Sequence, residues 1–70
     1  MNIDSIRMAL IEQVGIPHTF QYIGSRGMRE KFQGVITKVY PRTFLIETRG
    51  GGVRSFSYSD YLLHALKIVV

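Results

Sequence analysis

The segment GVITKVYPRTFLIE, from Gly34 to Glu47, consists of two apolar runs that meet at the pair Tyr40-Pro41. Proline has no N–H to donate to a strand ladder, so it belongs at a strand end or in a turn rather than inside a sheet. We therefore predict a strand over residues 30–40, a turn at YPRT, and a second strand over residues 43–49. Gly34 lies inside the first of these strands, where a glycine marks a bulge or a sharp bend.

The residues after this hairpin predict another strand and a short helical turn. The glycines of GGG, Gly50–Gly52, favour a tight turn into VRSFSYS, in which Phe56 and Tyr58 share one face. Ser57 and Asp60 have the spacing of a capping box, which predicts one turn of helix over residues 58–62.

A final strand is predicted over residues 64–70, in the segment HALKIVV. In the sheet formed by these strands, we expect Phe44 and Ile46 to face the interior beside Phe56.

The segment before the hairpin predicts a helix over residues 3–14, with Asn2 or Asp4 as its N-cap. Gly15 and Pro17 end this helix, and the alternating segment HTFQYI then predicts a strand. Four apolar residues fall on one helical face: Ile3, Ile6, Leu10 and Val14.

Met8 and Ile11 fall outside or at the edge of the apolar face of this helix. Two interpretations remain open for them. They cover the nearby sheet, or they contact another subunit.

The predicted order of one helix followed by five short strands indicates a mainly β fold. For so short a chain we expect a strongly bent, five-stranded SH3-like or Sm-like barrel, covered by the N-terminal helix. The whole chain, residues 1–70, is predicted to form a single domain, with the helix over about 3–14 and the barrel over about 17–70.

Composition excludes several classes of protein. The chain has 70 residues and no cysteine, so neither a disulfide nor a thiolate metal site can stabilise it. It begins with Met-Asn-Ile-Asp, without the basic and apolar regions of a signal peptide, and its apolar runs are too short to span a bilayer. We expect a cytoplasmic protein without a membrane segment.

No group of residues has the spacing of a catalytic or metal site. The two histidines, His18 and His64, are far apart in the sequence, and the five carboxylates are dispersed. The basic segment GSRGMREK, from Gly24 to Lys31, lacks the order of a phosphate-binding loop and leads into a strand. We therefore expect no enzyme and no cofactor, and a hairpin loop with solvated charges at this segment.

The net charge of +4 favours anionic partners, and five basic residues could form one face. With Tyr22 or Tyr61 as a stacking surface, such a face would bind single-stranded nucleic acid. Against this, aromatic residues in a small domain are needed for its core. The candidate binding surface consists of Arg26, Arg29, Lys31, Arg49 and Arg54.

The segments GVITKVYPRTFLIE and SFSYSDYLL resemble the Veg family of small proteins from Gram-positive bacteria. Phe56 departs from the family, which more often has tyrosine at this position. The matching residues that we expect to be mostly structural are Gly34, Tyr40, Pro41, Phe44, Ile46, Phe56, Tyr58 and Asp60.

This resemblance implies a non-catalytic cytoplasmic regulator that stimulates biofilm formation and the expression of extracellular-matrix genes. It also implies a protein partner, such as a transcriptional regulator. Nucleic-acid binding by a small basic barrel remains the alternative.

The last predicted strand favours self-association. LKIVV is strongly β-prone and carries one charge, Lys67, so an exposed edge of this strand would invite pairing. Pairing with a second copy would satisfy that edge, and Met8 and Ile11 would extend the contact. We therefore expect a homodimer.

Overall fold

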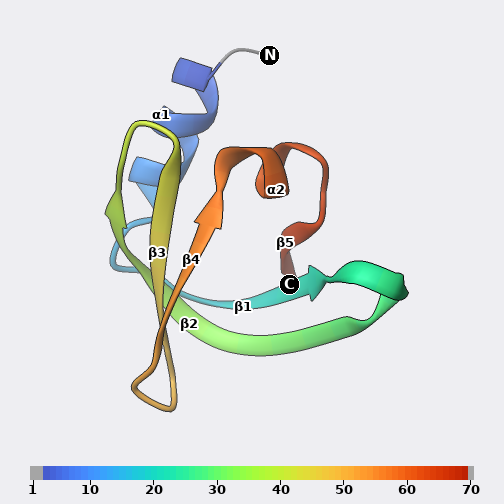
Figure 1. Cartoon of the computed structure of the whole chain (residues 1–70). Helices are drawn as coiled ribbons and strands as arrows, with labels where there is room; N and C mark the ends of the chain where they lie inside the picture. The colour runs from blue at the N-terminus through green and yellow to red at the C-terminus, as the bar shows by residue number, and fades with distance from the viewer. Residues whose placement is uncertain (1–2, 70) are drawn as a thin grey trace.

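The computed structural model describes residues 3–69 and contains one sheet of five antiparallel strands with a helix before it. Across the sheet the strands lie in the order β4-β3-β2-β1-β5 (Figure 1). This confirms the predicted mainly β fold with an N-terminal helix. The elements are α1 (Ile3–Gln13), β1 (Pro17–Ile23), the single-turn helix η1 (Ser25–Gly27), β2 (Arg29–Val39), β3 (Thr43–Thr48), β4 (Val53–Ser57), α2 (Tyr58–Leu62) and β5 (Leu66–Val69).

The sheet is strongly bent but open. In the sheet that residues 3–69 form, each strand pairs with the next one in the order given above. The first and last strands of that order, β4 and β5, are the two edges of the sheet. The short helix α2 follows β4, precedes β5 and contacts both (Figure 1). The predicted SH3-like or Sm-like barrel is therefore not confirmed, because α2 rather than a hydrogen-bonded ladder links the two edges.

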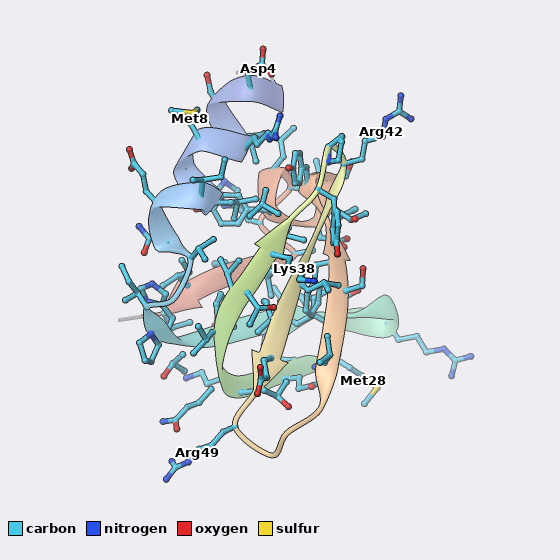
Figure 2. All side chains as sticks on the ribbon, turned by 90° about the vertical axis from the view of Figure 1, so that its left-hand side faces the viewer. Asp4, Met8, Met28, Lys38, Arg42 and Arg49 are labelled. Atoms are coloured by element: carbon cyan, nitrogen blue, oxygen red, sulfur yellow. The ribbon has the colours of Figure 1, made fainter. Side chains whose placement is uncertain are left out.

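Helix α1 packs beside β2 and α2 and buries Ile6 and Leu10, as the helical spacing predicts. Met8 and Ile11 lie on its other side, with 60% and 45% of their surface exposed. Figure 2 shows Met8 on the outside of the helix. Met8 therefore does not cover the sheet, and for Ile11 the two interpretations above stay open.

The helix ends at Gln13, where Gly15 adopts a left-handed conformation with φ of 84°. Val14, predicted on the buried face, lies beyond the last turn and is 40% exposed. Asp4 lies in the first turn, and Asn2 lies outside the described residues.

Pro41 lies in the turn between β2 and β3, as the sequence predicts. The Tyr40 N–H donates to the Thr43 carbonyl at 2.7 Å and closes this hairpin. The missing N–H of proline therefore costs the sheet no ladder hydrogen bond.

The core lies on the inner face of the bend, where Phe44 and Ile46 are fully buried. The ring of Phe56 lies 6.1 Å from that of Phe44, which confirms the predicted placement of all three side chains. The buried core residues are Ile6, Leu10, Phe20, Ile36, Phe44, Ile46, Phe56, Tyr58 and Leu66.

Strand β2 curves sharply (Figure 1), but its bulge is not at Gly34. The register against β3 shifts between Ile36 and Lys38, so Thr37 is the extra residue. A glycine is needed at position 34 for a different reason, because a Cβ there would lie 2.6 Å from Cγ2 of Ile46. Glycine thus lets β3 approach β2 more closely than any other residue would.

Helix α2 begins with the predicted capping box. The Asp60 N–H donates to Ser57 Oγ at 3.2 Å, and the Ser57 N–H donates to Asp60 Oδ2 at 3.1 Å. Tyr58 is buried, and its hydroxyl donates to the carbonyl of Tyr40. Tyr58 therefore ties α2 to the turn between β2 and β3, as expected for a structural residue.

Candidate interaction surfaces

The five predicted basic residues do not share one face. Side chains alternate along a strand, so Arg29 and Lys31 lie on the outer face of β2, opposite the buried face. Arg54 lies on the inner face of β4, two residues from buried Phe56. Arg26 is in η1, and Arg49 is in the turn after β3, where Figure 2 shows it projecting outward.

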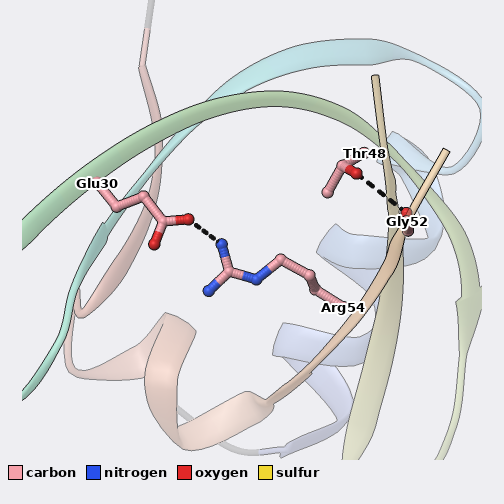
Figure 3. Close-up of polar contacts among 4 residues, drawn as sticks. All are labelled: Glu30, Thr48, Gly52 and Arg54. Atoms are coloured by element: carbon pink, nitrogen blue, oxygen red, sulfur yellow. Dashed lines mark hydrogen bonds and ion pairs between the residues drawn. The ribbon is translucent and has the colours of Figure 1, made fainter. Parts of the chain in front are cut away.

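The charged side chain of Arg54 makes contacts within the fold. Its guanidinium carbon lies 4.8 Å from the ring centre of Phe32, 5.1 Å from that of Phe56 and 5.8 Å from that of Tyr22. The guanidinium also forms an ion pair with Glu30, at the start of β2 (Figure 3). Arg54 therefore links the two halves of the bent sheet and covers the aromatic side chains between them.

Tyr22 and Tyr61, the predicted stacking residues, are both half-buried. Tyr22 packs against Phe56 with ring centres 5.3 Å apart, and both tyrosines lie against the core. Their rings thus contribute to the core, in agreement with the expectation that a small domain needs its aromatic residues there.

The outer face carries a row of cations that the sequence did not reveal. Lys67 of β5 is in register with Gln21 of β1, which is in register with Lys31 of β2. Within residues 3–69, Arg54 and Glu30 form the one ion pair, so both lysines lack an acidic partner there. Arg29 lies on the same face of β2, two residues before Lys31.

Arg49 extends this outer face at the end of β3. Its backbone N–H donates to the Gln33 carbonyl at 3.0 Å, and its guanidinium donates to Gln33 Oε1 at 2.8 Å. Both residues line a groove of about 530 Å³, which Glu47 also lines. The carboxylate reduces the positive charge at this end of the face.

A second groove lies beside β5 and has mostly apolar side chains. Its volume is about 380 Å³, and next to it Leu63 is 76% exposed. His64, in the turn before β5, has a left-handed backbone with φ of 61°. The predicted strand over 64–70 is accordingly shorter, because β5 begins only at Leu66. The groove is lined by Tyr61, Leu62, His64, Leu66, Lys67 and Ile68.

The titratable side chains that the structure describes form no cluster suited to metal binding. His18 Nε2 lies 2.7 Å from Gln13 Oε1 and ties β1 to the end of α1. None of the helices in the described part of the chain is long and apolar enough to cross a bilayer.

A family model matches residues 1–69 of the chain. The matching family is described as biofilm formation stimulator Veg. A comparison with curated proteins gave no match.

Proposed function

Because the chain belongs to the Veg family of biofilm formation stimulators, we propose that it is a non-catalytic module that acts through a protein partner. The partner is a regulator of transcription, and its contact with this chain promotes expression of extracellular-matrix genes. We place this contact in the cytoplasm, where such regulators act.

The observation that carries this proposal is the exposed apolar surface at α2 and β5. Leu62 and Leu63 are 43% and 76% exposed, beside a groove lined by further apolar side chains. Adjoining apolar surface on a small protein marks a contact site more often than a scattered apolar residue does. Protein binding therefore explains a feature that a solitary, purely structural domain would not need.

The test is complementation of a deletion strain of the native host with single variants. Leu63→Glu should lower biofilm mass and transcription of matrix genes toward the level of the deletion strain. Met28→Glu is the matched control, because Met28 is similarly exposed, at 72%, in the loop before β2. Equal complementation by both variants, at equal protein levels, would remove the surface at α2 and β5 from the proposed function.

Nucleic-acid binding is the second candidate, and the row of Lys31 and Lys67 favours it. Binding through several phosphates weakens by orders of magnitude between low and moderate salt. The combined variant Lys31→Glu and Lys67→Glu should then abolish salt-sensitive retention on single-stranded nucleic acid. If the unaltered chain shows no such retention, this candidate is eliminated.

A further inference from the structure

One backbone hydrogen bond shows which N–H and C=O groups of β5 do not pair with β1. The Ile23 N–H donates to the Ala65 carbonyl at 2.7 Å, so these two residues form a hydrogen-bonded pair. Such pairs alternate with non-bonded pairs along an antiparallel ladder. The next pair in the register, Tyr22 with Leu66, is therefore non-bonded, and so is Phe20 with Ile68. The N–H and C=O groups of Leu66 and Ile68 consequently point away from β1, toward the open edge.

The side chains of β5 differ between its two faces. Leu66 and Ile68 face inward and line the apolar groove with Tyr61. Lys67 faces outward, in the row with Lys31. A strand added at this edge would place alternate side chains over the groove and beside Lys67.

We propose that the open edge of β5 binds an extended segment of a partner protein in which apolar side chains alternate with acidic ones. This inference rests on the proposed function, in which the chain acts through a protein partner. The backbone of the segment pairs with Leu66 and Ile68, its apolar side chains cover the groove, and its carboxylates lie beside Lys67.

A second copy of the chain fits this edge less well. In a two-fold antiparallel pair of β5 strands, the register that uses all the free groups pairs Leu66 with Ile68 of the other copy. That register places the two Lys67 side chains directly opposite each other, and like charges in this position destabilise a sheet. The other edge strand, β4, has the sequence VRSFS and offers no carboxylate to Lys67. The expected homodimer through this edge remains a prediction, and it becomes an alternative outcome of the test.

The probe is a seven-residue synthetic peptide of alternating valine and glutamate, blocked at both ends. Added to the isotope-labelled chain, it should shift the amide resonances of Leu66 and Ile68 and slow their hydrogen exchange. A peptide with lysine in place of glutamate should bind at least fivefold more weakly. N-methylation of the peptide bonds that face β5 should abolish binding, because the added strand then has no N–H to donate.

The charge-swapped variant Lys67→Glu provides the sharper comparison. It should bind the lysine peptide better than the glutamate peptide, which reverses the preference of the unaltered chain. Unchanged preference, shifts confined to β4, or no binding of the glutamate peptide at millimolar concentration would each overturn the proposal. A solution mass above that of one chain would also overturn it, in favour of a homodimer, if the mass returned to that of one chain in Ile68→Pro, which removes a free N–H at the open edge of β5, but not in β4 variants.

These outcomes separate the two proposals. If the peptides fail while Leu63→Glu still loses biofilm stimulation, the partner binds the apolar surface without adding a strand. If the peptides bind as expected while Leu63→Glu complements fully, strand addition at β5 is supported. The proposed role of the apolar surface at α2 and β5 in biofilm formation is then rejected.

Discussion

Gly34→Ala gives the most direct test of how closely β2 and β3 approach each other. A Cβ at this position would lie 2.6 Å from Cγ2 of Ile46 and 2.9 Å from the carbonyl oxygen of Glu47. Ile46 is fully buried, and the second atom belongs to the backbone, so neither can move without shifting the strand. The added methyl group must therefore force the two strands apart at the bend.

The expected loss of stability follows from two opposing effects. Overpacking of a well-packed core typically costs about 1–3 kcal/mol. Replacing glycine by alanine also restricts the unfolded chain, which stabilises the native state by about 0.4–1 kcal/mol where the backbone conformation is compatible. Because the Cβ of Gly34→Ala would contact both a buried side chain and a backbone oxygen, we expect the first effect to dominate, with a net loss of about 1–2 kcal/mol.

Urea unfolding followed by circular dichroism measures this difference, and Gly50→Ala is its matched control. Gly50 lies in the turn after β3, and a Cβ added there would have no atom within 4 Å, so Gly50→Ala should change stability little. Adding Ile46→Leu to Gly34→Ala removes the Cγ2 contact and should recover part of the loss, since the close backbone oxygen remains. A Gly34→Ala chain at least as stable as the unaltered one would refute the close approach of the two strands.

Three further predictions concern side chains that hold the fold together. Phe44→Ala should cost about 3–5 kcal/mol in thermal or urea unfolding, because Phe44 is fully buried; nearly unchanged stability would contradict its place in the core. Asp60→Ala should cost about 1 kcal/mol through loss of the bond to the Ser57 N–H, whereas Asp60→Asn keeps an acceptor and most of the stability; equal effects of the two changes would argue against capping. Arg54→Gln should destabilise the chain by about 1 kcal/mol and Glu30→Gln by less, because the exposed ion pair adds little beyond the ring contacts of Arg54; a larger loss in Glu30→Gln would assign the stabilisation to the ion pair instead.

Features set by neighbouring residues could be predicted from the sequence. Pro41 fixes a turn because it lacks an N–H, and the pair Ser57 and Asp60 satisfies the start of α2 within one helical turn. The openness of the sheet and the position of the bulge could not be predicted in this way. Both depend on which strands meet, and nothing in the immediate neighbourhood of Thr37 distinguishes it from the other residues of β2.

The candidate surface was predicted less well, because its five basic residues were grouped by their nearness in the sequence. Their positions in the sheet, which decide which residues share a face, were not known from the sequence. Arg54 lies two residues from Phe56, and this spacing alone places both on one face if Phe56 is in the core. The alternation rule could therefore have placed Arg54 on the inner face, away from Arg29 and Lys31. Lys67 could not have been added by any local rule, since its place beside Lys31 requires the order β2-β1-β5.

The distribution of charge explains how the two candidate partners can be told apart. Glu30 is paired with Arg54, and Asp60 caps α2, so these acids do not offset Lys31 and Lys67 on the outer face. A nucleic acid would use those lysines through its phosphates, and its affinity would fall steeply with salt. An added strand would hold its place chiefly by backbone hydrogen bonds and apolar contacts at β5, which salt screens little. Raising the salt concentration should therefore remove a nucleic acid from this face while leaving a bound strand largely in place, and a peptide whose binding fell as steeply as that of a nucleic acid would contradict pairing at the edge.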